Sequence, residues 1–147
     1  MAIEIPGKGE EAGKIYVRAF TAGVSSDSPE VILTSGDVAL VNFNEANIFV
    51  QKLEAQVINA FTSTCVFIIG DSADSDGWWT DTGFNCSATA ADFNVAASTV
   101  GFASGKLYSS TSAILTNIAG APAAGKAKFR ITYMRDADTD LSPSTGL

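Results

Sequence analysis

Apolar and polar residues alternate along residues 126–136 (KAKFRITYMRD), and this alternation constrains the fold more than any other feature of the sequence. Successive side chains of a β-strand point to opposite faces of the sheet, so a period of two indicates a strand with one buried face. One face would carry Ala127, Phe129, Ile131 and Tyr133, and the other Lys128, Arg130 and Thr132. We therefore expect a long strand that contributes one face to a hydrophobic core.

Short segments with the composition of strands recur along the rest of the chain and are separated by turn residues. They cover residues 13–23, 30–34, 37–43, 64–70, 98–103, 106–110 and 112–119. Ile15, Val17 and Ala19 alternate with Tyr16, Arg18 and Phe20 in the first of them. The dipeptide Ser35-Gly36 predicts a tight hairpin of residues 30–34 and 37–43. Residues 64–70 are apolar on both faces, which is typical of a central strand.

Residues 45–61 (EANIFVQKLEAQVINAF) are compatible with two structures. Leu53, Val57 and Phe61 are spaced as on one side of a helix, and the central KLEA sequence has a high helix propensity. The second half also alternates between apolar and polar residues, as a strand does. Because the neighbouring segments are strands, we predict one long strand that leads into residues 64–70.

A chain of 147 residues corresponds to one domain, and the sequence shows neither an internal repeat nor a linker. We predict an all-β fold, a single antiparallel sandwich of jelly-roll-like or immunoglobulin-like type formed by residues 13–135. Residues 1–12 and 136–147 lack the core pattern and are predicted to be extended arms. The arms carry the candidate interface residues Ile3, Ile5, Leu141 and Leu147. We expect at least one arm to order on a neighbouring subunit by strand addition.

The charges and the missing residue types exclude several functions. Nine Lys and Arg residues against sixteen Asp and Glu residues give a net charge of −7, so direct binding of nucleic acid is not expected. The chain has no histidine, which removes histidine-dependent catalytic triads, and it contains neither GxSxG nor a phosphate-binding GxxxxGKS or GxxxxGKT motif. No apolar stretch has the length of a transmembrane helix, and the first residues do not resemble a signal peptide. We expect a protein that is not an enzyme and does not enter a membrane.

Charged residues make up only 17% of the chain, which is a low share for a freely diffusing monomer. A surface with so few charges is expected to be covered in part by partners, including further copies of the chain. The two cysteines, Cys65 and Cys86, are interpreted as a buried small hydrophobe and a loop residue. A disulfide between them has no support from the sequence, since nothing indicates an oxidising compartment.

Four aspartates surround a glycine turn within residues 71–81, namely Asp71, Asp74, Asp76 and Asp81. Calcium prefers several hard oxygen ligands, so this loop is a weak candidate for a calcium site. The spacing does not match an EF-hand, whose loop ends on a glutamate where this chain has Thr82. Aspartates at the end of a strand commonly cap backbone amides. We favour this structural role and predict no cofactor, with calcium as the alternative.

Trp78 and Trp79 directly follow the acidic loop. Adjacent residues of a strand point to opposite faces, so we expect one indole in the core and the other in an interface with a partner. Two further possibilities are that both rings pack inside the domain, or that they form a platform for a sugar ligand.

Three segments of the chain resemble a group of bacteriophage proteins, namely Gly70–Trp79 (GDSADSDGWW), Gly105–Ser110 (GKLYSS) and Gly125–Asp136 (GKAKFRITYMRD). Tailed bacteriophages encode small, acidic, alanine- and threonine-rich β-proteins with such segments beside their capsid genes. The resemblance extends over most of residues 45–136, whereas the first forty residues lie outside it. The chain is thus similar to tailed-phage virion structural proteins that resemble capsid decoration (cement) proteins.

This resemblance implies that the chain decorates and stabilises a tailed-phage capsid, bound to the major capsid protein and to copies of itself. It also implies a place on the capsid surface of the virion after assembly in the cytoplasm of the host bacterium, and it transfers no catalytic residue. The alternative function is a phage tail or surface adhesin, or a carbohydrate-binding module, that uses the acidic loop and Trp78 or Trp79.

Overall fold

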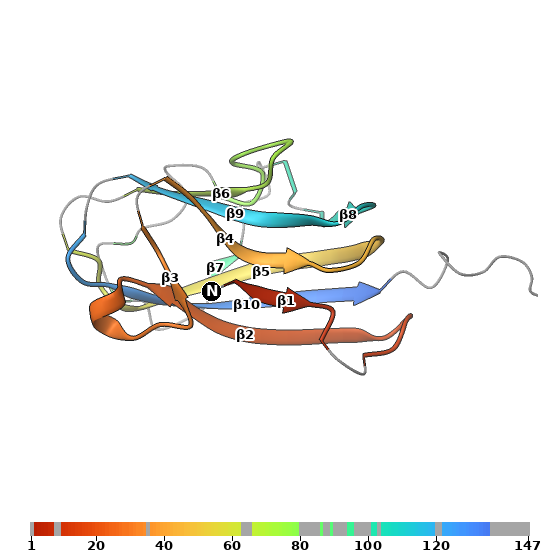
Figure 1. The fold of residues 1–147 in the computed structure, drawn as a ribbon, viewed down its shortest axis with the longest axis horizontal. Coiled ribbons are helices and arrows are strands. Elements are labelled where there is room, and N and C mark those ends of the chain that lie inside the picture. Colours follow the sequence, from red (N-terminus) through yellow and green to blue (C-terminus); the bar gives the residue numbers. More distant parts are fainter. Residues whose placement is uncertain are drawn as a thin grey trace, which may run out of the picture.

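The computed structural model describes residues 2–7, 10–34, 36–62, 66–79, 86, 89, 94–95, 101–102, 104–119 and 122–135. The strands are β1 (Ile3–Ile5), β2 (Ile15–Gly23), β3 (Val31–Ile32), β4 (Gly36–Phe43), β5 (Ile48–Asn59), β6 (Val66–Gly70), β7 (Asn94–Val95), β8 (Lys106–Tyr108), β9 (Ser112–Ala119) and β10 (Lys126–Arg135). One short 3-10 turn, η1, covers Ser25–Asp27. None of the described residues forms a helix that is long and apolar enough to cross a membrane. The predicted all-β class is confirmed (Figure 1).

The strands form two sheets that face each other as a sandwich (Figure 1). Sheet A has the order β1-β4-β9-β6, and sheet B has the order β3-β2-β10-β5-β7, with β8 also paired to β5. Most neighbours are antiparallel, but β1 pairs with β4 and β3 pairs with β2 in parallel. Both sheets are therefore mixed, whereas the sequence led us to expect antiparallel pairing throughout.

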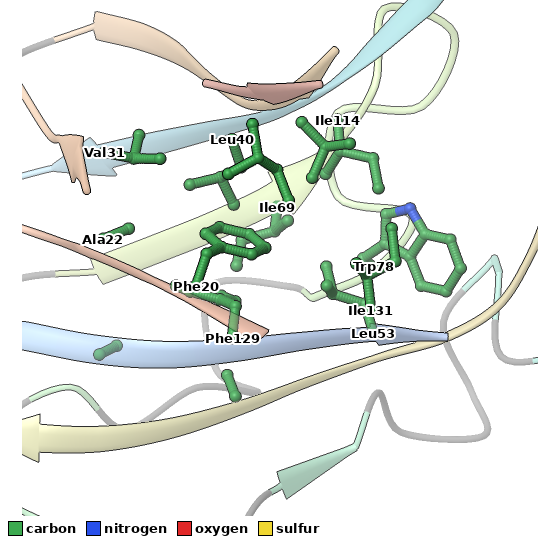
Figure 2. Packing of buried hydrophobic residues seen from close by; sticks show 14 of the residues in the cluster. Phe20, Ala22, Val31, Leu40, Leu53, Ile69, Trp78, Ile114, Phe129 and Ile131 are labelled. Carbon is green, nitrogen blue, oxygen red and sulfur yellow. The ribbon is translucent and has the colours of Figure 1, made fainter. Parts of the chain in front are cut away.

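The predicted long strand of residues 126–136 is β10, which lies in the middle of sheet B between β2 and β5. Its apolar face is fully buried, as the alternation indicated. The rings of Phe129 and Phe20 stack with centroids 5.5 Å apart. In Figure 2, residues from both sheets point into the common core, among them Leu40, Ile69, Ile114, Leu53, Ile131 and Trp78. The core is thus the space between the two sheets.

Residues 45–61 form a strand rather than a helix, as predicted, since β5 covers Ile48–Asn59. β5 pairs with β10 from end to end, with register shifts at Lys126/Ala127 and Thr132/Tyr133. Its inward residues Leu53, Ala55 and Val57 are buried. Pairing with a central strand and burial of this alternating face outweigh the helix propensity of KLEA.

The predicted hairpin around Ser35-Gly36 is wrong. β3 pairs in parallel with β2 of sheet B, whereas β4 pairs with β1 and β9 of sheet A. The chain crosses between the sheets here, and Gly36 opens β4 with a φ of +88°, in the left-handed region that favours glycine. A dipeptide typical of turns indicates only that the chain changes direction. The strand with which β3 pairs is decided by the burial of Val31 beside β2.

The segment predicted as a central strand, residues 64–70, corresponds to β6 at the end of sheet A. Phe67 and Ile69 are nevertheless fully buried. The chain folds back beside Ile69, whose N–H donates to the carbonyl of Trp79 and whose carbonyl accepts from the N–H groups of Trp78 and Trp79. This returning turn explains why a strand at the end of a sheet has an apolar sequence.

The prediction that residues 1–12 form an arm outside the core is wrong for the described part of this segment. Ile3 and Ile5 lie in β1 and are buried between the sheets. Further along, the hydroxyl of Tyr133 donates to the carboxylate of Glu10, and the guanidinium of Arg135 donates to the carbonyl of Glu10. The segment is held by the chain's own core. The predicted arm of residues 136–147, with Leu141 and Leu147, lies outside the described residues.

Cys86 is buried and disulfide-bonded. Cys86 lies outside the strands, as expected of a loop residue, but its disulfide had no support from the sequence. Cys65 lies outside the described residues, so its interpretation as a buried small hydrophobe stays a prediction.

Candidate interaction surfaces

Two of the segments that carry the phage resemblance meet in one buried polar cluster. Asp71 follows β6 and is only 3% exposed, and Lys106 begins β8. The Oδ1 atom of Asp71 accepts hydrogen bonds from the backbone N–H groups of Ala73 (2.9 Å) and Asp74 (3.0 Å). Its Oδ2 atom accepts a hydrogen bond from Lys106 Nζ at 2.6 Å. The first aspartate of the acidic loop therefore caps its own turn and ties it to a distant strand.

Aromatic rings complete this cluster, which we call the Asp71 network (Asp71, Lys106, Tyr108, Trp78 and Phe102). Trp78 Nε1 donates to the hydroxyl of Tyr108 at 3.0 Å, and the carboxylate of Asp71 lies near enough to this hydroxyl to influence its pKa. The ammonium of Lys106 lies 4.2 Å from the ring centroid of Phe102 and 5.1 Å from that of Tyr108. The ammonium of Lys106 is thus held by a carboxylate and by two ring faces.

The environment shifts the pKa values of the network in opposite directions. Burial alone would raise the pKa of Asp71, but hydrogen bonds from Lys106 and from the backbone of Asp74 and Ala73 outweigh it and hold this pKa below its usual range. Burial raises the pKa of Tyr108, and the nearby Asp71 carboxylate adds to this effect. The network therefore holds an ionised aspartate beside a protonated tyrosine.

Both sequence segments begin with a glycine for a steric reason. A Cβ atom on Gly70 would lie 2.1 Å from the carbonyl oxygen of Asp74, which closes the acidic turn. Gly105 has a φ of +93°, and a Cβ atom there would lie 2.8 Å from the carbonyl oxygen of Val50 in β5. Gly70 thus allows the acidic turn to close, and Gly105 allows the segment before β8 to lie against β5.

The remaining aspartates of the loop do not join Asp71 as a metal site in the described part of the chain. Asp74 closes the turn through its backbone carbonyl, which accepts from the N–H groups of Asp71 and Gly77, and Asp76 is exposed. Asp81 lies outside the described residues. Among the residues that the structure describes, no group of three His, Cys, Asp or Glu side chains is placed to hold a metal ion.

We expect calcium to leave the stability of the protein unchanged, because both carboxylate oxygens of Asp71 already accept hydrogen bonds. A calcium site at a hundredfold excess over its Kd would add about 2.7 kcal/mol to the free energy of unfolding. Thermal melts with added calcium and with a chelator measure this difference. Equal melting temperatures are expected, and a rise of several degrees with calcium would contradict the structural role of the loop.

Trp78 and Trp79 are both 1% exposed, so the expectation of one inward and one outward ring is wrong. The alternation rule applies to extended strands, whereas the N–H groups of both tryptophans donate to the same carbonyl of Ile69. The Trp78 ring packs edge-on against Phe102 with centroids 5.4 Å apart. Neither indole is available as a sugar platform or as an anchor for a partner in this conformation.

Exposed large apolar side chains of the described residues gather on the strands of sheet B. They are Ile15, Val17, Ile32, Ile58 and Leu107. Ile15 is 58% exposed and Val17 is 60% exposed, and both lie on β2 with Ala19 on the same outward face. We call these three residues the β2 stripe. The sequence showed the alternation of β2 but not which face turns outward, since both faces carry apolar residues.

An ion pair lies beside the β2 stripe on the outer face of sheet B. Arg130 Nε and Nη2 donate to the two carboxylate oxygens of Glu54 at 2.8 and 2.9 Å. This hydrogen bonding lowers the pKa of Glu54 despite its burial. A shallow groove of about 350 Å³ runs past the pair and is lined by Val17, Gln51, Lys52 and Thr132 as well. Sheet B thus presents a surface that is apolar at one edge and charged toward its middle.

Two solved structures contain chains with a similar fold. A chain of the cyanophage Pam1 capsid asymmetric unit aligns with a TM-score of 0.57 at 17% identity, over 88% of this chain and 89% of that chain. A chain of the acidic stable capsid structure of Helicobacter pylori bacteriophage KHP30 aligns with a TM-score of 0.56 at 13% identity, over 84% and 90%. Comparisons of the sequence with protein-family models and with curated proteins find no match. The chain therefore has a fold that occurs in phage capsid structures, which confirms the resemblance to phage virion proteins at the level of the fold.

Proposed function

We propose that this chain is a non-enzymatic structural protein of a tailed-phage virion that decorates and stabilises the capsid as a cement protein. It binds the major capsid protein and further copies of itself on the capsid surface, after assembly in the cytoplasm of the host bacterium. The observation that carries this proposal is the fold, which nearly the whole chain shares with chains of two phage capsid structures.

The surface of the domain supports binding rather than catalysis. The exposed large apolar side chains of the described residues lie on sheet B, as expected for a protein that covers this face with partners. The buried acids of the described residues, Asp71 and Glu54, are already paired with Lys106 and Arg130. The chain has no histidine to act as a general base near neutral pH.

The alternative of an adhesin or carbohydrate-binding module loses its main support. That function required Trp78 or Trp79 on the surface beside free aspartates. Both indole rings are buried, and Asp71 is bound to Lys106. No further observation on the described residues favours glycan binding, so we propose a single function.

Capsid binding can be tested with particles that lack this protein. Purified chain is added to such particles, which are then sedimented and imaged, with chain alone as the control for aggregation. We expect the chain to sediment with the particles up to a saturating ratio, to lie on the icosahedral shell, and to raise the temperature at which the particles break. Chain that remains in the supernatant, or that is found only on the tail, would contradict the proposal.

A further inference from the structure

Among the residues that the structure describes, strand β2 has an open edge along most of its length. It pairs with β10 from Ile15 to Gly23, but on its other side β3 reaches only Ala22 and Gly23. In Figure 1, β2 runs along the lower border of sheet B. Next to β3, the N–H of Thr21 donates to Glu30 Oε1 at 3.2 Å, which closes the edge there. The open part of the edge therefore comprises residues 15–20.

The backbone groups on this open edge belong to the β2 stripe. Val24 N–H donates to the carbonyl of Gly125, so the even-numbered residues of the ladder face β10. In an antiparallel pair, neighbouring residues direct their N–H and C=O groups to opposite sides. The contacts of Thr21 with Glu30 and of Gly23 with Leu33 on the other side agree with this assignment. Ile15, Val17 and Ala19 thus direct their N–H and C=O groups away from the sheet.

Apart from Arg18, which lies on the inner face and donates to the carbonyl of Glu4, this edge lacks the features that usually protect an open strand. Natural proteins place prolines, bulges or outward charges on such edges to prevent pairing with other chains. β2 contains no proline, and its ladder with β10 has no register shift. Its outward side chains are the apolar β2 stripe. A regular strand edge with apolar side chains on its outward face is suited to the addition of another strand.

We propose that a second copy of this chain pairs with β2 through its own β2, in antiparallel orientation with the two Val17 residues opposite each other. In this register Ile15 lies opposite Ala19 of the second copy, so every residue of the β2 stripe finds a partner from the other β2 stripe. Each such pair exchanges two backbone hydrogen bonds. The contact joins the two copies of sheet B into one continuous sheet and covers the apolar stripe.

The charges of β2 select this register over its neighbours. If the second β2 is shifted by two residues in one direction, Lys14 lies opposite Arg18 of the second copy. If it is shifted by two residues in the other direction, the two Arg18 residues lie opposite each other. Like charges directly opposite each other destabilise a strand pair. In the proposed register Arg18 lies opposite Tyr16, and Lys14 lies opposite Phe20. A second β2 therefore fits this edge in one register, which covers both β2 stripes and keeps like charges apart.

The inference deepens the proposed self-association on the capsid, and it can be tested in solution without particles. Cysteines introduced singly at positions 17 and 19 report the register, with wild type as the control for the native cysteines. Opposite Val17 residues would have Cα atoms about 5.5 Å apart, within the range of a disulfide, whereas two Ala19 residues would be separated by more than about 13 Å along the strands. Mild oxidation should cross-link Val17→Cys efficiently and Ala19→Cys poorly. A mixture of Ile15→Cys and Ala19→Cys should cross-link as Val17→Cys does.

A charge on the stripe provides a second test. Val17→Lys places two lysines opposite each other and should weaken self-association, measured by light scattering, by about tenfold or more. Ile58→Lys is the matched control, because Ile58 is also exposed on sheet B but lies on β5, and it should leave association unchanged. Both variants should melt as folded proteins. Since the chain carries a net charge of −7, added salt should strengthen the dimer.

Three results would overturn the inference. They are a strict monomer of wild type at high concentration, equal cross-linking at positions 17 and 19, and association that survives Val17→Lys but disappears when residues 136–147 are removed. If the chain fails to bind capsids but Val17→Cys cross-links efficiently, the proposed function is rejected while the proposed dimer contact is supported.

Discussion

Replacement of Asp71 by alanine is expected to lower the free energy of unfolding by about 3 kcal/mol, because it leaves the partly buried ammonium of Lys106 without its carboxylate. The change also removes the acceptor of the backbone N–H groups of Ala73 and Asp74. Denaturant unfolding of the variant measures the loss. Ser72→Ala is the control, since Ser72 is an exposed residue of the same loop and its replacement should change stability by less than about 0.5 kcal/mol. Equal effects of the two substitutions would contradict the network.

The same residue predicts how stability depends on pH. The pKa of Asp71 is lower in the folded protein than its usual value, so its contribution is complete above the usual pKa and is lost as the pH falls through the folded pKa. Wild type should therefore lose more stability on acidification than Asp71→Asn, which cannot ionise at this position. Unfolding curves measured from neutral to acidic pH give the slope of the free energy of unfolding against pH for wild type and for Asp71→Asn. Parallel curves would mean that Asp71 has no shifted pKa.

The long strands β2, β4, β5, β9 and β10 could be predicted from the sequence, because a period of two is a local property, whereas the short strands β1 and β7 were not predicted. The buried face of β10 and the strand character of β5 both followed from alternation. The assignment of strands to sheets could not be predicted, since it depends on contacts between distant segments. Ser35-Gly36 shows the limit. It has the composition of a hairpin turn, but the burial of Val31 against β2 places the preceding strand in the other sheet.

The role of the acidic loop could be predicted only in part. The expectation that its aspartates cap a turn is correct for Asp71, which accepts two backbone N–H groups. Its pairing with Lys106 could not be inferred, since thirty-five positions separate the two residues and only the fold brings them together. The outward position predicted for one tryptophan is wrong because both residues lie in a turn, where the alternation of a strand does not apply. The β2 stripe was visible as an alternation, but its outward direction depends on the sheet that covers the other face.

Ile5→Ala is expected to lower the free energy of unfolding of the isolated protein by about 2–4 kcal/mol, since Ile5 is fully buried and its truncation leaves a cavity. Ile15→Ala is the matched control, because it removes the same atoms from a side chain that is 58% exposed, and it should cost less than about 0.5 kcal/mol in the monomer. Denaturant unfolding at a concentration where the protein is monomeric compares the two.

This pair of variants distinguishes two possible roles of residues 1–12, namely a strand of the core and an arm that binds a neighbouring subunit. A core strand contributes to stability in the isolated chain, whereas an arm that orders only on a neighbouring subunit contributes nothing until it is bound. The parallel pairing of β1 with β4 and the burial of Ile3 and Ile5 support the first role. If Ile5→Ala unfolded like wild type but lost capsid binding, the residue would act in an interface between subunits. We expect the opposite result, with stability reduced and capsid binding retained at temperatures where the variant is folded.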